Sequence, residues 1–127
     1  MNVLLIEADR LLAKNIVQAF TGAGNAVQWH VDPQSAITAA DVRAPDLIIL
    51  DFLLSNRSGT EFLYEFRSYP EWANVPAISY SSLSDNELKN YSPSFKQLGV
   101  KKVCYKSTTP LSELVDAARQ LVLTPAA

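Results

Sequence analysis

Short apolar segments alternate along the chain with stretches in which apolar residues recur every three or four positions. The apolar segments are the predicted strands, at residues 3–6, 26–31, 47–51, 76–81 and 101–105. The first and third contain unbroken apolar runs, which are typical of strands buried on both faces of a sheet. A helix is expected after each strand, since the apolar spacing between the segments follows a helical period.

Signals for helix starts lie between these strands. Asp9 and the pair Asp32-Pro33 are expected to cap two helices, and Ser58 begins a capping box that ends at Glu61. The predicted buried faces contain Leu12, Ile16, Ala19, Phe20 and Ala23 in the first helix, Ala36, Ile37 and Ala40 in the second, Phe62, Leu63 and Phe66 in the third, and Leu111, Leu114, Val115, Ala118, Leu121 and Val122 in the last. These faces predict helices packed against a central sheet.

Two segments are less regular. Residues 70–75 are predicted to form a loop, with Tyr69 and Trp72 as loop packing groups. Residues 84–98 have helical character, but Pro93 lies in their middle and is expected to break or restart that helix.

Strands separated by helices must run parallel, with right-handed crossovers. The sequence therefore predicts an α/β fold: a three-layer, doubly wound, five-stranded parallel sheet of the flavodoxin-like type. We expect a single domain over residues 1–127, with a core of about 2–122 and a short C-terminal tail.

Composition narrows the function classes. The net charge of −2 provides no basic field, so nucleic-acid binding is not expected. No apolar run is long enough for a membrane span, and the start of the chain lacks the basic region of a signal peptide. Cys104 is the sole cysteine, which excludes an internal disulfide and fits a cytoplasmic location. We expect Cys104 to be a small buried strand residue.

Polar side chains lie at or just beyond the carboxyl ends of four of the predicted strands. Because ligands of an open parallel sheet bind outside the carboxyl ends of its strands, these side chains are expected to share one crevice. They are Glu7 and Asp9, Asp51, Ser81 and Ser82, and Lys106. An aspartate nucleophile with a lysine and a hydroxyl beside it would suit a phosphorylated carboxylate, and an acidic pair would supply oxygen ligands for Mg²⁺.

Four segments and one glycine connect this pattern to a known family. Residues 1–10 resemble an opening strand with its acidic cluster, 46–51 a strand ending in an acceptor aspartate, 75–82 a strand ending in a hydroxyl residue, and 99–106 a segment ending in a lysine. Gly59 lies eight residues after Asp51, as the family's glycine does. In order and spacing, nearly the whole chain resembles the CheY-like receiver domain of two-component response regulators.

The resemblance implies a role for each candidate residue. Asp51 would be the phosphoacceptor, Ser81, Ser82 and Lys106 would contact the phosphoryl group, Glu7, Asp9 and Asp51 would form an acidic Mg²⁺ site, and Ser81 and Val103 would occupy the switch positions. The implied partners are a histidine kinase or phosphotransfer protein, and a downstream protein that contacts about residues 83–122.

The chain departs from the family pattern at four places. Ala8 replaces a carboxylate that contacts the metal, which predicts weakened Mg²⁺ affinity. Val103 replaces the aromatic switch residue. Ser107 replaces a cis proline, and a trans bond is expected because a cis bond before serine costs roughly 3 kcal/mol. The stretch from Ser81 to Lys106 is about three residues longer than usual.

Three functional hypotheses follow. The leading one is a receiver module that is not an enzyme, accepts a phosphoryl group on Asp51 and signals through protein contacts. The alternative is a phosphorylation-independent pseudoreceiver with a partly degenerate active site. A remote alternative is a small flavodoxin-like nucleotide- or flavin-binding protein, but residues 7–10 lack the glycine-rich loop that it needs. The chain could also be a piece of a longer regulator.

Overall fold

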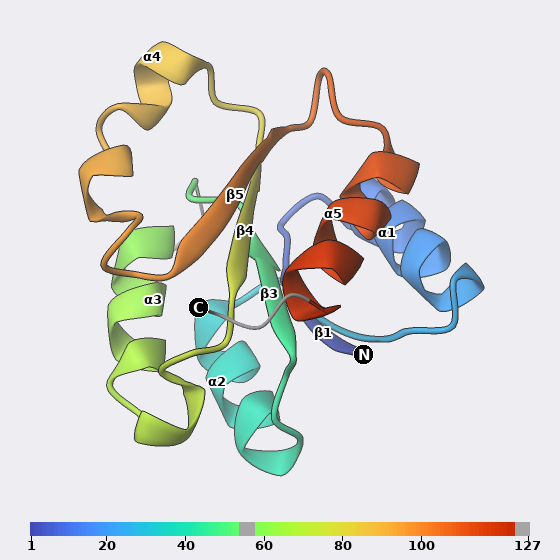
Figure 1. Cartoon of the computed structure of the whole chain (residues 1–127), viewed down its shortest axis with the longest axis horizontal. Helices are drawn as coiled ribbons and strands as arrows, with labels where there is room; N and C mark the ends of the chain where they lie inside the picture. Colours follow the sequence, from blue (N-terminus) through green and yellow to red (C-terminus); the bar gives the residue numbers. More distant parts are fainter. Residues whose placement is uncertain (54–57, 124–127) are drawn as a thin grey trace.

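A parallel sheet forms the centre of the molecule in the computed structural model, which describes residues 1–53 and 58–123 (Figure 1). In these residues the sheet has five strands in the order β2-β1-β3-β4-β5. The strands are β1 (Asn2–Ile6), β2 (Ala26–His30), β3 (Leu47–Leu50), β4 (Ala77–Ser81) and β5 (Val100–Tyr105). Each predicted strand is present, and the predicted flavodoxin-like α/β topology is confirmed.

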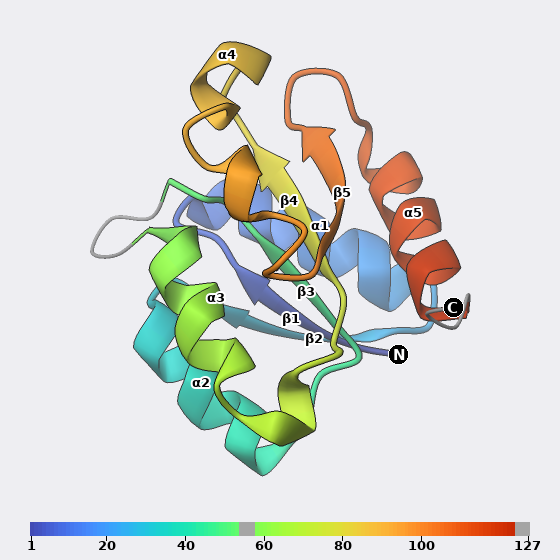
Figure 2. The same cartoon turned by 60° about the vertical axis from the view of Figure 1, so that its left-hand side comes forward.

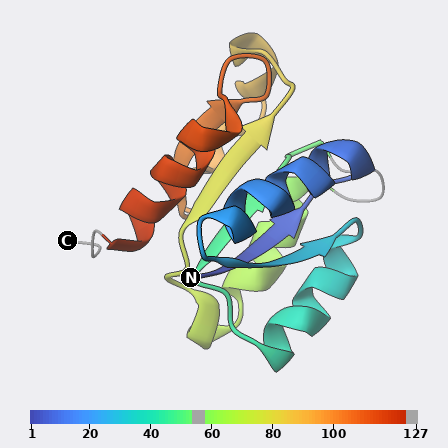
Figure 3. The ribbon, with the colours of Figure 1, turned by 90° about the vertical axis from the view of Figure 1, so that its right-hand side faces the viewer.

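Helices cover both faces of the sheet. They are α1 (Arg10–Gly22), α2 (Pro33–Val42), α3 (Gly59–Arg67), α4 (Asp85–Leu88) and α5 (Leu111–Leu123). Figure 3 shows α1 and α5 side by side on one face, and Figure 2 shows α2 and α3 together on the other. Helix α5 includes Leu123, where the short C-terminal tail was expected to begin; residues 124–127 lie outside the described residues.

Two apolar clusters separate along the strands because successive side chains point to opposite faces. Leu4 and Ile6 of β1 join the cluster beneath α2 and α3, whereas Val3 and Leu5 join the cluster beneath α1 and α5. Every residue of β1 and β3 is buried, as the unbroken apolar runs predicted.

The helix caps mostly follow the sequence prediction. The Asp9 side chain accepts a hydrogen bond from the Leu12 amide at 3.1 Å, and the Ser58 hydroxyl accepts one from the Glu61 amide at 3.2 Å. Pro33 occupies the first turn of α2, but the Asp32 side chain makes no capping hydrogen bond, so that part of the prediction was wrong.

The helix expected over 84–98 is much shorter than its apolar pattern suggested. Helix α4 is one turn closed by a capping box of Ser84 and Glu87, and a second, 3-10 turn covers Ser92–Ser94. Asn90 and Ser92 favour turns over helix, and Pro93 cannot donate a helical hydrogen bond.

The segment at 70–75 also departs from its prediction. It contains a 3-10 turn at Pro70–Trp72 instead of a plain loop. Trp72 is 2% exposed and stacks on Phe66, so it belongs to the main core beneath α2 and α3.

Candidate functional site

Four strand ends supply the candidate site. Glu7 and Asp51 directly follow β1 and β3, Ser81 is the last residue of β4, and Lys106 directly follows β5. Since the strands are parallel, these positions lie at the same edge of the sheet. The lysine amide donates to the Ser81 carbonyl at 2.9 Å, which fixes the end of β5 beside the end of β4.

The Asp51 carboxylate is buried, and both of its oxygens accept hydrogen bonds from protein donors. Its Oδ1 accepts hydrogen bonds from the Ser81 hydroxyl at 2.9 Å and from the Leu53 amide at 3.0 Å. Its Oδ2 accepts one from the Lys106 ammonium at 3.0 Å. The side chain is 7% exposed, so these donors offset the cost of burying its charge. The predicted grouping of Asp51, Ser81 and Lys106 is therefore present in the geometry.

The Glu7 side chain provides a second carboxylate that contacts the Lys106 ammonium. Its Oε1 lies 2.8 Å from the lysine Nζ, its Oε2 accepts from the Asp9 amide at 3.0 Å, and its side chain is 4% exposed. The lysine therefore bridges two nearly buried carboxylates. The Lys106–Ser107 peptide bond is trans, as expected from the absence of proline, and the side chain still reaches Asp51.

These carboxylates control the protonation of Lys106. Burial lowers the pKa of its ammonium, but the hydrogen bonds and negative charges of Glu7 and Asp51 outweigh burial and raise that pKa above its ordinary value. The lysine therefore stays charged at physiological pH and neutralises part of the acidic pair.

The side chains of the other predicted site residues, Asp9 and Ser82, make no hydrogen bond to this cluster in the described part of the chain. Asp9 is exposed and its carboxylate caps α1, while the neighbouring Ala8 is exposed and offers no ligand atom. Ser82 is exposed at the end of β4, and in the described residues its side chain makes no hydrogen bond. Ser81 alone provides the hydroxyl to Asp51.

The acidic residues do not fit a divalent metal ion as they stand. All four side-chain oxygens of Glu7 and Asp51 already accept from protein donors. Across residues 1–53 and 58–123, no group of three or more histidine, cysteine, aspartate or glutamate side chains is placed to hold a metal ion.

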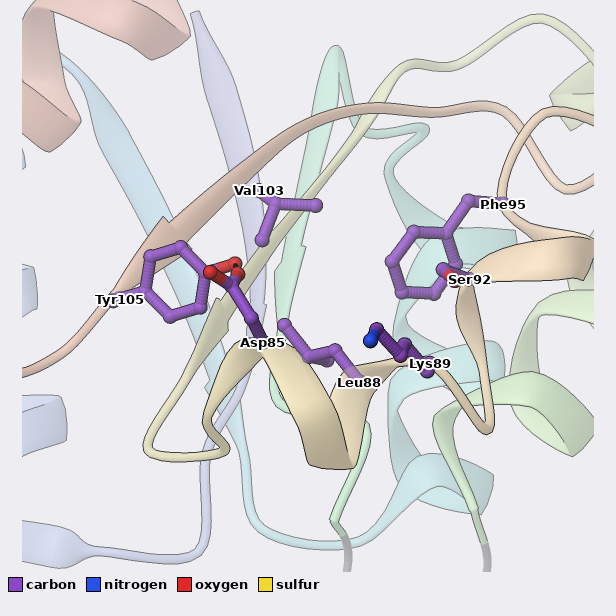
Figure 4. A pocket seen from close by; sticks show the side chains of 7 residues that line it. All are labelled: Asp85, Leu88, Lys89, Ser92, Phe95, Val103 and Tyr105. Atoms are coloured by element: carbon purple, nitrogen blue, oxygen red, sulfur yellow. Dashed lines mark hydrogen bonds between the residues drawn. The ribbon is translucent and has the colours of Figure 1, made fainter.

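Val103, the other predicted switch position, lines a groove between α4 and β5. This α4–β5 groove has a volume of about 460 Å³ and is lined by Asp85, Leu88, Lys89, Ser92, Phe95, Val103 and Tyr105. Figure 4 shows Leu88, Phe95 and Val103 around a shared space, with Tyr105 meeting Asp85. The Tyr105 hydroxyl donates to the Asp85 carboxylate, a contact that sequence reasoning missed because no local pattern links the two residues.

A family match identifies the class of domain to which this chain belongs. Residues 3–119 match the response regulator receiver domain. The chain belongs to this family. Receiver domains accept a phosphoryl group on an aspartate in general, interact with histidine kinases or phosphotransfer proteins, and generally bind Mg²⁺ at the acidic active site.

Solved structures of receiver domains are similar to this one over most of its length. A putative response regulator from Chloroflexus aurantiacus is 20% identical, with a TM-score of 0.84 over 97% of this chain and 98% of that one. The chemotaxis protein CheY4 of Vibrio cholerae is 21% identical, with a TM-score of 0.83 over 96% and 98% of the two chains.

Sequence relatives are longer proteins. The KDP operon transcriptional regulatory protein KdpE of Escherichia coli is 34% identical over 69% of this receiver chain and 38% of its own length. The transcription factor prr1 of Schizosaccharomyces pombe is 30% identical over 94% of this chain and 21% of its own length. The receiver chain thus spans less than half of the length of these relatives. None of the helices in the described residues has the length and apolar character needed to cross a membrane.

Proposed function

We propose that this receiver domain is a non-enzymatic signalling module that accepts a phosphoryl group on Asp51 and transmits the change through protein contacts. The observation that carries the proposal is the placement of the Asp51 carboxylate between the Ser81 hydroxyl and the Lys106 ammonium. A cytoplasmic location is part of the proposal and rests on family membership.

The three side chains divide the chemistry. With acetyl phosphate as the donor, the bond between phosphorus and the acetate oxygen breaks, acetate leaves with the electron pair, and a carboxylate oxygen of Asp51 bonds to phosphorus. The Lys106 ammonium then offsets the phosphoryl charge, and the Ser81 hydroxyl donates a hydrogen bond to a phosphoryl oxygen.

The α4–β5 groove supports a contact site for the downstream partner. The contact between Asp85 and Tyr105 joins α4 to β5. Each of these two residues is close in sequence to a side chain that donates to Asp51: Ser81 lies four residues before Asp85, and Lys106 directly follows Tyr105. Leu88 and Phe95 provide an apolar lining for the groove, within the predicted contact region of 83–122. Movement of either donor toward a phosphoryl group would therefore alter this groove.

Phosphorylation is tested by intact mass after incubation with acetyl phosphate. We expect the native protein to gain the mass of one phosphoryl group, and Asp51→Asn to gain nothing because it lacks the nucleophile. A parallel reaction with Ser82→Ala should resemble the native protein, since the exposed Ser82 side chain makes no hydrogen bond to Asp51. If the native mass is unchanged with every small phosphodonor, the proposal fails.

The pseudoreceiver is the second candidate, and a specific observation favours it. Every oxygen of Asp51 already has a protein donor, and the side chain is nearly buried. If the domain is a pseudoreceiver, the α4–β5 groove should bind its partner with the same affinity in the native protein and in Asp51→Asn, whether or not a phosphodonor is present.

A further inference from the structure

We propose that the Lys106 ammonium, held in place by Glu7, takes the position of a divalent cation in this site, so that the site works without Mg²⁺. The inference rests on the proposed function for its relevance to phosphorylation. The claim that a lysine ammonium replaces a divalent cation can itself be tested on the unphosphorylated protein.

The first observation is that the Lys106 ammonium contacts both carboxylates of the site. One ammonium lies 2.8 Å from Glu7 Oε1 and 3.0 Å from Asp51 Oδ2, so it bridges the two buried carboxylates as a metal ion would. The lysine side chain is itself only 18% exposed, which limits the water available to separate the charges. The two carboxylates and the ammonium together leave one net negative charge.

The occupied oxygens carry the second step. A metal ion would have to share Glu7 Oε1 and Asp51 Oδ2 with the ammonium, and the other two oxygens, Glu7 Oε2 and Asp51 Oδ1, already accept hydrogen bonds from the backbone amides of Asp9 and Leu53. Mg²⁺ gives up its own water reluctantly and gains affinity with the number of charged oxygen ligands. At each of these carboxylate oxygens an ion would therefore compete with a protein donor for the negative charge, which leaves it little to gain here.

The third observation concerns Ala8, which has no side-chain oxygen to offer a metal ion. It lies between Glu7 and Asp9, and it is exposed, so a longer side chain at this position meets solvent and not the core. Asp9, the nearest alternative ligand, has its carboxylate on the Leu12 amide. A carboxylate added at position 8 would therefore supply charged oxygens that no protein donor already holds.

Glu7 acts in this scheme as a positioning residue for Lys106. Its backbone is fixed on both sides, because the Glu7 amide donates to the His30 carbonyl at 3.1 Å and its carbonyl accepts from the Trp29 indole at 2.9 Å. The carboxylate therefore has a defined place from which it holds the ammonium over Asp51.

The decisive experiment is titration with Mn²⁺, followed by the electron paramagnetic resonance of the free ion, as a probe of divalent-cation binding. We expect weak binding to the native protein and an affinity at least about ten-fold higher in Ala8→Asp. Gln120→Glu adds the same charge at an exposed position of α5 and should bind like the native protein. Ala8→Glu provides a second carboxylate variant if Ala8→Asp folds poorly.

Two outcomes would overturn the inference: native protein that binds Mn²⁺ as tightly as Ala8→Asp, or carboxylate variants at position 8 that gain no affinity. A rate measurement with acetyl phosphate extends the test. The native rate should be the same in Mg²⁺ and in EDTA, whereas Ala8→Asp should become stimulated by Mg²⁺. If Asp51 accepts no phosphoryl group at all, the proposed function fails, but the Mn²⁺ titration still decides the inference.

Discussion

At the residue scale, the candidate site depends on the Lys106 ammonium, which contacts two carboxylates. Removing the lysine would leave Glu7 and Asp51 as buried carboxylates that share no cation. Such an uncompensated pair is far more costly than the intact ion pair is stabilising. The same residue therefore links the stability of the domain to the chemistry of Asp51.

Replacement of Lys106 by methionine tests this link. We expect Lys106→Met to lower the free energy of unfolding at neutral pH by about 3 kcal/mol. Because the folded-state pKa of Lys106 is raised above its ordinary value of 10.5, its stabilisation is complete below that pH and is lost as pH rises through the raised pKa. Urea unfolding of the native protein and of Lys106→Met should therefore show that the difference between their free energies of unfolding decreases as pH rises through this pKa. Equal free energies of unfolding at neutral pH would contradict the role of Lys106 as the cation that compensates Glu7 and Asp51.

At the scale of elements, the junction between β3 and α3 is set by close packing at Gly59. A Cβ at this position would lie 2.9 Å from the Phe52 Cα and 2.9 Å from the Phe52 ring, and the Gly59 amide donates to the Phe52 carbonyl at 3.1 Å. The glycine that the family places eight residues after its acceptor thus has a steric reason here: it brings the start of α3 against the residue that follows Asp51.

Gly59→Ala should therefore destabilise the domain by about 1–3 kcal/mol, because backbone must move to make room. The matched control is Gly22→Ala in the last turn of α1, where an added Cβ meets no atom within 4 Å and alanine favours the helix. Chemical denaturation gives both values. A shift of the denaturation midpoint in the same direction and by similar amounts in the two variants would contradict the steric role of Gly59.

At the scale of the whole molecule, the two apolar clusters enclose the sheet from both sides. Cys104 of β5 belongs to the cluster beneath α1 and α5, is 3% exposed, and has a thiol pKa raised by burial. It is the sole cysteine of the chain, so its reactivity reports on the opening of this cluster alone.

We expect the Cys104 thiol to react with Ellman's reagent far more slowly in the folded protein than in urea, since burial disfavours the thiolate and excludes the reagent. The folded-state rate should increase with urea in parallel with global unfolding. Immediate reaction in the absence of denaturant would show that β5 is not packed as described.

The sequence was sufficient for most of the fold because a parallel sheet covered on both faces needs unbroken apolar strands, as in β1 and β3. It was also sufficient for the grouping of Asp51, Ser81 and Lys106, since parallel strands bring their carboxyl ends to one edge. It could not decide the role of Asp9, because one carboxylate suits a helix cap and a metal site equally well. The ion pair of Glu7 with Lys106 and the contact of Tyr105 with Asp85 depend on side-chain reach across the fold.

The two tryptophans of the chain lie on opposite sides of the sheet. Trp72 is inside the cluster beneath α2 and α3, and Trp29 packs against the cluster beneath α1 and α5. Each layer thus contains its own intrinsic fluorophore, and single-tryptophan variants would follow the assembly of the two layers separately during refolding. Since the Trp29 indole also donates a hydrogen bond to the carbonyl of Glu7, its emission offers an optical signal from the edge of the candidate site without any added dye.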